Sequence, residues 1–261
     1  MIGNIRILFH QGMQSIPDIT NAEIPGVFRG TPVITHDKID EETLVELCPT
    51  DAIGFNPVSI DLGKCTFCGA CAFAFPEKIR FTKDYKMATN NRRDLIVKED
   101  VAKPILLDAD LIRQEISKLF KGSLKLRHVS SGGDNSCELE LNACGNVNFD
   151  MGRFGIEFVA SPRHADGIVI TGPMTENMAI PLQHCYDAIP DPKIIILAGT
   201  DAISGGIFAG SPAMNRSFLS DHKIDLYVPG NPVHPLTFIN GVLELIKDRK
   251  GDFQHRSAAI K

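Results

Sequence analysis

The spacing of apolar residues changes along the chain and divides it into two unlike parts. Up to about residue 100, apolar positions come in short groups interrupted by Pro and Gly, such as 51–55 and 58–61. From about residue 123, short apolar runs alternate with longer stretches of helical spacing. Runs that are apolar at every position, such as 194–197, are typical of strands covered by helices on both faces of a parallel sheet. The pattern predicts a loop-rich module followed by an α/β domain.

The second part has a regular order of predicted elements. The expected strands cover 156–160, 168–171, 194–198 and 226–228, and the expected helices cover about 137–149, 176–188 and 235–247. Pro181 lies inside the second helix and argues for a kink or a break there. Between the two parts, Asp108 as N-cap and Gly122 as the C-terminal glycine frame a predicted linker helix. We therefore expect units at 1–100, 101–122 and 123–250, followed by a tail at 251–261.

Composition and charge narrow the class of protein. The chain has 261 residues, 43% hydrophobic residues and a net charge of -5, as in an ordinary globular protein. An acidic chain offers no general field for nucleic-acid phosphates, so we expect no nucleic-acid partner. No apolar run approaches the roughly 18 residues of a membrane span, and the first fifteen residues lack a secretory pattern, so we expect a cytoplasmic protein. Ile2, Ile5, Leu8 and Phe9 form a short apolar stripe that suits either core packing or a membrane-arm partner.

Four of the seven cysteines lie close together in the sequence. Cys65, Cys68 and Cys71 form a Cys-x2-Cys-x2-Cys run, and Cys48-Pro49 stands upstream of it. In two-cluster bacterial ferredoxins, the Cys-Pro that ends one run binds the cluster of the other run. The run here ends in Phe75-Pro76, so Cys48 supplies the fourth thiolate. The alternative is a zinc site or plain buried cysteines, although zinc sites usually present paired Cys-x2-Cys knuckles.

The same spacing excludes a second cluster in this module. Counting backwards from Cys48 places three of its ligands at Lys38, Glu41 and Leu44, and the fourth falls at Phe75, where the later run ends; none of these residues carries sulfur. Cys48, Cys65, Cys68 and Cys71 therefore predict one 4Fe-4S cluster.

Several motifs in matching order resemble known redox subunits. Phe28-Arg29-Gly30-Thr31-Pro32, Cys48-Pro49 and the run from Leu62 to Gly69 resemble the ferredoxin-like subunit of formate hydrogenlyase. Segments 161–166, 190–193, 204–208 and 227–230 resemble the small subunit of group 4 NiFe hydrogenases, which is similar to the complex I subunit that carries the terminal cluster. The resemblance implies a fusion: an α+β ferredoxin-like module followed by an α/β open parallel sheet (flavodoxin-like) domain.

The second part departs from that family at its metal ligands. The positions that hold the family's proximal 4Fe-4S cluster carry Asp134, Cys137, Asp201 and Asn231 here. A single thiolate does not hold a cubane, so the proximal cluster is expected to be lost. The four residues then form either a polar pocket filled by water or a hard-metal or small-ligand site. The resemblance implies that His164 and Arg163 face a partner subunit or a quinone-like cavity, and the alternative is a surface or hydrogen-bonded loop pair. Gly132-Gly133 is interpreted as inherited loop geometry.

The resemblance implies an electron-transfer subunit rather than a catalyst on its own. Its one 4Fe-4S cluster would serve a hydrogenase-like or complex I-like membrane oxidoreductase, with a hydrogenase-like large subunit and membrane-arm subunits as partners. The chain would be peripheral to the inner membrane through those partners. The alternative is a structural subunit that has kept the docking surface and lost the relay.

Overall fold

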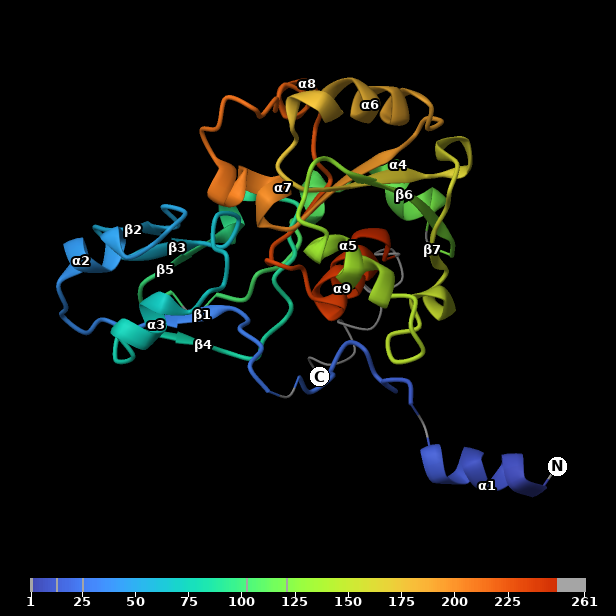
Figure 1. Ribbon diagram of the computed structural model, residues 1–261, viewed down its shortest axis with the longest axis horizontal. Coiled ribbons are helices and arrows are strands. Elements are labelled where there is room, and N and C mark those ends of the chain that lie inside the picture. The colour runs from blue at the N-terminus through green and yellow to red at the C-terminus, as the bar shows by residue number, and fades with distance from the viewer. Residues whose placement is uncertain (1, 13, 25, 102, 121, 248–261) are drawn as a thin grey trace, which may run out of the picture.

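The structure is a computed structural model that describes residues 2–12, 14–24, 26–101, 103–120 and 122–247. Two groups of strands lie side by side (Figure 1), a smaller one formed by residues 32–98 and a larger one formed by residues 124–228. The predicted tail at 251–261 lies outside the described residues. No helix among the described ranges is long and apolar enough to cross a membrane.

The smaller group contains two antiparallel sheets. Its elements are β1 (Pro32–Ile34), α2 (Glu41–Glu46), β2 (Ile53–Gly54), β3 (Ser59–Asp61), α3 (Ala70–Ala74), β4 (Ile79–Phe81) and β5 (Ile96–Lys98), with a 3-10 turn at Arg92–Leu95. β1 pairs with β4, and β3 pairs with both β2 and β5. The loop between β3 and α3 carries Cys65 and Cys68, and Cys71 lies in the first turn of α3.

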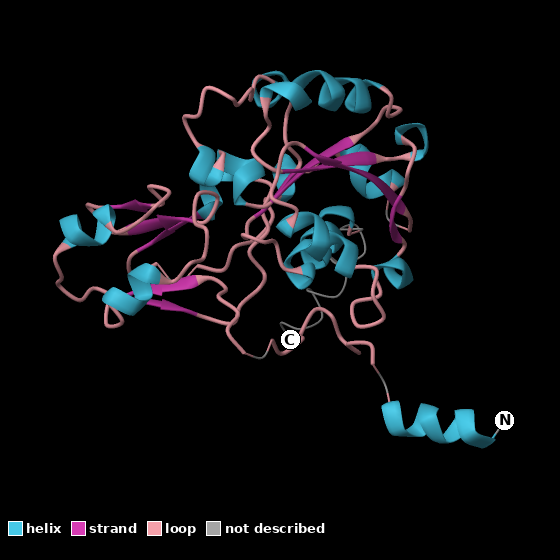
Figure 2. Ribbon diagram, in the orientation of Figure 1, coloured by secondary structure: helices cyan, strands magenta, loops and turns pink. Residues whose placement is uncertain are grey.

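The larger group is built on a five-stranded parallel sheet (Figure 2). The strands are β6 (Leu124–Ser130), β7 (Ile156–Phe158), β8 (Gly167–Thr171), β9 (Ile194–Ala198) and β10 (Leu226–Val228), in the order β10-β9-β8-β6-β7. The helices are α4 (Gln114–Leu119), α5 (Ser136–Ala143), α6 (Glu176–Asp187), α7 (Thr200–Ser204), α8 (Phe218–Asp221) and α9 (Pro235–Ile246). Counted within this part, the strand order is 2-1-3-4-5 read from the β7 edge, which is the flavodoxin-like order.

Helices cover both faces of the sheet, as the apolar strands require. Ile168 and Ile170 of β8 pack toward α6 and α8, whereas Val169 between them packs with α9 on the opposite face. The first of these cores also contains the buried residues of the smaller group, among them Cys65 and Phe67. One continuous core therefore joins the cysteine loop to the parallel sheet.

The linker helix predicted from Asp108 to Gly122 is wrong as one element. A 3-10 turn at Ala109–Leu111 is followed by α4, and Arg113 between them is extended, with φ -63° and ψ 132°. Its guanidinium makes two hydrogen bonds to Asp225 over 3.1 and 3.0 Å and a third to the main-chain oxygen of Lys193. These contacts with the parallel sheet outweigh the local helical spacing.

The other element predictions have mixed outcomes. Strands at 194–198 and 226–228 are confirmed, and the helices expected at 176–188 and 235–247 are confirmed as α6 and α9. Pro181 is exposed within α6 and does not end it. The helix expected at 137–149 ends at Ala143, because Gly145 and Asn146 follow. The central strand β6 is not among the predicted elements, although Leu124 and Leu126 are buried and Lys125 between them is exposed.

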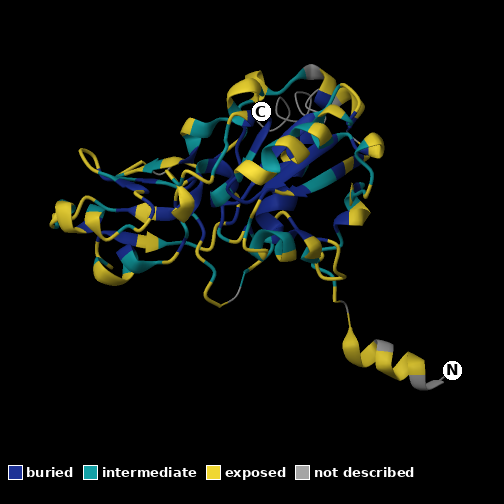
Figure 3. Cartoon of the chain, turned by 45° about the horizontal axis from the view of Figure 1, so that its top comes forward, coloured by how far each residue is buried: buried dark blue, intermediate teal, exposed yellow. Residues whose placement is uncertain are grey.

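The first helix, α1 (Ile2–Gln11), lies away from both strand groups (Figures 1 and 3). Ile5 is 50% exposed and Phe9 is 82% exposed, so these two members of the predicted apolar stripe are not core residues. The stripe's other side chains, those of Ile2 and Leu8, lie outside the described residues.

Candidate metal centre

The cysteine loop is fixed at its start by Asp61, the last residue of β3. The main-chain oxygen of Asp61 accepts hydrogen bonds from the amides of Lys64 and Cys65. Its carboxylate accepts the Gly63 amide at 2.9 Å and two bonds from the Arg92 guanidinium at 2.8 and 2.7 Å. A paired carboxylate of this kind holds the loop in one conformation before any metal binds.

Left-handed residues then turn the loop toward α3. Phe67 has φ 53° and Gly69 has φ 80°. A Cβ atom at position 69 would stand 2.6 Å from Nε of Arg29, so glycine is required both by its backbone conformation and by space. The turn brings Cys71 into α3, close to Cys65 and Cys68.

The four thiols lie close enough to influence one another. Burial raises the pKa of Cys65 to about 12, and the three neighbouring thiols add to the effect. Burial likewise raises the pKa of Cys71 to about 11, with further contributions from Cys68 and Cys48. Without a positive ion the two buried sulfurs stay protonated, whereas a bound metal deprotonates its thiol ligands.

Backbone amides point at the sulfurs. The amide of Ala52 donates to Sγ of Cys48 and the amide of Phe67 donates to Sγ of Cys65, each over 3.3 Å. The amide of Ala72 donates to Cys71 and lowers its pKa against the effect of burial. Amide donors stabilise sulfur in its charged state and are one of the means by which proteins set cluster potentials.

The spacing of the sulfurs speaks against a single zinc ion. With Zn–S bonds of roughly 2.3 Å, the sulfurs of a tetrahedral site stand about 3.8 Å apart. Among the described residues, three potential metal ligands have atoms that all lie within 4.8 Å of one another. They are His36, Glu99 and Asp100, and the group contains no cysteine. No three cysteine sulfurs of the described residues therefore gather at the spacing of a single zinc ion.

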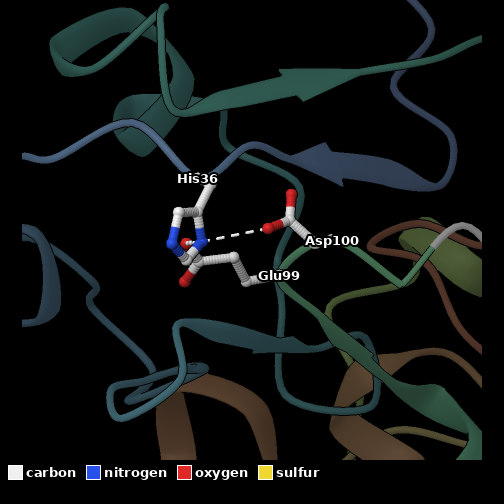
Figure 4. Close-up of side chains that lie close together, drawn as sticks. All are labelled: His36, Glu99 and Asp100. Carbon is white, nitrogen blue, oxygen red and sulfur yellow. Dashed lines mark ion pairs between the residues drawn. The ribbon is translucent and has the colours of Figure 1, made fainter.

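The His36 group is an ion-pair network rather than a metal centre (Figure 4). Nδ1 of His36 lies 2.8 Å from Glu99 and 2.9 Å from Asp100. The same oxygen of Glu99 accepts a bond from Nζ of Lys78 at 2.9 Å, and Lys78 is only 2% exposed. A cation at this place would lie beside a buried ammonium group, so the cluster carries no metal assignment.

The second set of predicted residues does not form a compact ligand shell. Oδ1 of Asp134 is turned onto the amide and hydroxyl of Ser136, at 2.9 and 2.6 Å. The side chain of Cys137 packs on Gly199, where an added Cβ would stand 2.5 Å from its Sγ. Burial raises the pKa of Cys137 to about 12. Oδ1 of Asp201 is buried without a hydrogen-bond partner.

Comparison with known proteins bears on the part of the chain that carries this second set. The family model described as NADH ubiquinone oxidoreductase, 20 Kd subunit, matches residues 135–245. The chain is 37% identical over 142 residues to the probable membrane-bound hydrogenase subunit mbhJ of Pyrococcus furiosus, which covers 53% of this chain and 85% of that protein. The chain belongs to the 20 Kd subunit family.

Two further relatives of this family are covered less completely. An NADH-quinone oxidoreductase subunit of Heliobacterium modesticaldum is 43% identical over 116 residues, covering 44% of this chain and 66% of that protein. Formate hydrogenlyase subunit 7 of Escherichia coli is 36% identical over 140 residues, covering 53% of this chain and 55% of that protein. The match to the 20 Kd family model begins at residue 135, after the cysteine loop, so the family model does not cover that loop.

A contact that the sequence did not reveal joins the cysteine loop to the 20 Kd family part. The hydroxyl of Thr200, at the start of α7, donates to the main-chain oxygen of Cys65 at 2.7 Å and lies 3.3 Å from that of Gly230. Thr200 precedes Asp201 and Gly230 precedes Asn231. The loop with the three clustered cysteines therefore packs directly on the place where the family resemblance puts the proximal ligands.

Proposed function

We propose that this chain is an electron-transfer subunit with one 4Fe-4S cluster bound by Cys48, Cys65, Cys68 and Cys71. The observation that carries the proposal is that four thiols, from the segment just after α2, the loop after β3 and the start of α3, lie near one another, with backbone amides directed at the sulfurs of Cys48, Cys65 and Cys71. When bound, such a cluster accepts and releases one electron at a time. The chain's own residues hold the thiolates, supply amide donors and exclude water from the buried sulfurs.

The topology of the smaller group supports a ferredoxin-like module. From β1 to β4 the elements follow the order β-α-β-β-α-β, with β1 paired to β4 and β2 paired to β3. This order is that of ferredoxin-like folds. We place the module at 1–100, the linker at 101–122 and the small-subunit-like domain at 123–250.

The names of the relatives support the assembly to which the chain would belong. They are subunits of a membrane-bound hydrogenase, of NADH-quinone oxidoreductases and of formate hydrogenlyase. We propose that the chain works in a hydrogenase-like or complex I-like membrane-associated oxidoreductase, beside a hydrogenase-like large subunit and membrane-arm subunits. It would lie on the cytoplasmic side and reach the inner membrane through those partners.

Only the first module carries a complete ligand set. Asp201 and Asn231 offer oxygen and amide groups where a cubane needs thiolates, and Asp134 is already bonded to Ser136. The packing of the cysteine loop on Thr200 and Gly230 supports a position for the proposed cluster beside the expected proximal site. We propose that this cluster takes over the position from which electrons leave the chain.

A structural role is the second candidate, and the loss of thiolates at 134, 201 and 231 is the observation that favours it. Iron and acid-labile sulfide, measured per chain on anaerobically purified protein, separate the two. About four irons and four sulfides are expected for one cluster. About eight irons would contradict the single-cluster assignment. An iron-free protein that still assembles into its complex would contradict the electron-transfer role and support the structural one.

A further inference from the structure

A cavity lies between the cysteine loop and the start of α9. Its volume is about 150 Å³, and Phe67 of the loop and Asn231 of the parallel-sheet domain both line it. One water molecule needs roughly 10–15 Å³ by the same measure, so the cavity has room for a ligand of several atoms. Asn231 is one of the four positions of the expected proximal site, whereas Cys137 and Asp201 of that site are not in the cavity wall, so the cavity borders that site without coinciding with it.

The polar groups of the wall include a strong cation and no acid. Arg29, Asn231, His234 and Thr237 contribute side chains, and the other lining residues are apolar or glycine. Nη1 of Arg29 donates to the main-chain oxygen of Phe67 at 3.2 Å. In the part of the chain that the structure describes, no carboxylate forms a salt bridge with Arg29. Its remaining guanidinium donors are available to a ligand.

The start of α9 adds further donors. Nδ1 of His234 accepts the amide of Leu236 at 3.2 Å, so the neutral ring carries its proton on Nε2. Burial lowers the pKa of His234 to about 4, which keeps the ring neutral near pH 7. Thr237 is 1% exposed, and its hydroxyl has no hydrogen-bond partner among the residues that the structure describes. The amino end of this twelve-residue helix adds a partial positive charge.

We propose that this cavity binds one small oxyanion, either inorganic phosphate or the carboxylate of a small organic acid, with Arg29 as its charged anchor. The ligand would accept hydrogen bonds from the guanidinium and from donors at the start of α9. The apolar wall around Phe28 and Phe67 limits the size of the ligand, and the anchor, Arg29, is itself exposed to solvent. The site depends on Arg29 and α9 and does not require the cluster.

Calorimetric titration of the full chain, purified anaerobically and placed in a buffer free of phosphate and carboxylates, tests the proposal. Saturable binding of phosphate or acetate at one site per chain is expected, and the stronger of the two identifies the source of the oxyanion. Arg29→Gln should weaken that binding at least tenfold, and Arg29→Lys should weaken it less. Arg80→Gln removes the same charge from an exposed position outside the cavity and should leave the affinity unchanged.

Two outcomes would overturn the proposal. They are the lack of saturable binding of either anion, and equal affinity in Arg29→Gln and the unchanged chain. Thr237→Val provides a second test within the wall and should weaken binding about threefold. Iron content, measured on the same preparations, is a separate result: anion binding by an iron-free chain would support this site and contradict the proposed cluster.

Discussion

Thr200 and Cys65 are joined by a buried hydrogen bond across 135 positions of the chain, with the hydroxyl donating to the main-chain oxygen over 2.7 Å. The amide of Thr200 also donates to the main-chain oxygen of Gly230 at 2.9 Å. One side chain at the carboxyl end of β9 therefore holds the cysteine loop on the parallel sheet. In open α/β sheets this edge is where functional loops gather.

Removing the Thr200 hydroxyl should loosen the loop. In Thr200→Val the buried oxygen of Cys65 loses its donor, which costs about 1–3 kcal/mol. We expect a matching fall in the free energy of unfolding, measured by urea denaturation, and faster loss of iron to a chelator. Thr200→Ser keeps the donor and should behave as the unchanged chain does. Equal iron loss in the Val and Ser variants would show that the bond does not hold the loop.

Single cysteine-to-serine substitutions should separate the cysteines that bind the proposed cluster from those that do not. Cys68→Ser removes one proposed cluster ligand and should abolish the electron paramagnetic resonance signal of the reduced cluster. Cys137→Ser changes a half-buried thiol at one of the positions predicted to have lost the proximal cluster and should leave that signal unchanged. The comparison uses the same chemical change at two places in one chain. A signal that survives in Cys68→Ser and disappears in Cys137→Ser would move the cluster to the second site.

The sequence predicts the cysteine set and most of the parallel sheet for identifiable reasons. The spacing of Cys65, Cys68 and Cys71 is local, and β9 is apolar at every position, so neither depends on distant residues. The helix predicted around Arg113 is wrong because its guanidinium finds Asp225 more than one hundred positions away. The strand β6 is absent from the prediction although its first residues alternate between buried and exposed.

The relations between the two parts cannot be predicted from local patterns. Nothing in the local sequence of Thr200 indicates that its hydroxyl meets the loop of Cys65, since the contact exists only after both parts have folded. The cavity between Phe67 and Asn231 arises in the same way. Spacing predicts the ligands, and packing determines where they lie.

The buried Lys78–Glu99 pair should be important for the stability of the first module. Lys78 is 2% exposed and its Nζ reaches Glu99 at 2.9 Å and the main-chain oxygen of Asp37 at 2.9 Å. Lys78→Met removes the cation from Glu99, which keeps His36 and the amide of Val58 as partners, so the expected cost is about 1–3 kcal/mol. The free energy of unfolding measures the loss. Lys103→Met, at an exposed lysine 4.0 Å from Asp94, should change it by less than about 1 kcal/mol.

Asp201 should destabilise the chain at neutral pH. Burial raises the pKa of its carboxyl, the carboxylates of Asp134 and Glu138 raise it further, and Arg216 partly offsets the shift. Oδ1 has no hydrogen-bond partner. A folded-state pKa above the unfolded value stabilises the fold at low pH, and this contribution is lost as the pH rises through the folded value.

Asp201→Asn should therefore raise the free energy of unfolding at pH 7.5 by about 0.5–1 kcal/mol, a figure reduced because the residue is partly accessible to water. The gain should shrink as the pH is lowered to 4.5, because protonation of the native carboxyl becomes more favourable at lower pH. Urea denaturation at the two pH values measures the difference, and Asp110→Asn on the surface is the matched control. A gain that does not change with pH would attribute the effect to packing rather than to charge. A loss of stability at pH 7.5 would mean that the carboxylate has a favourable partner, and a bound cation is then the first candidate to examine.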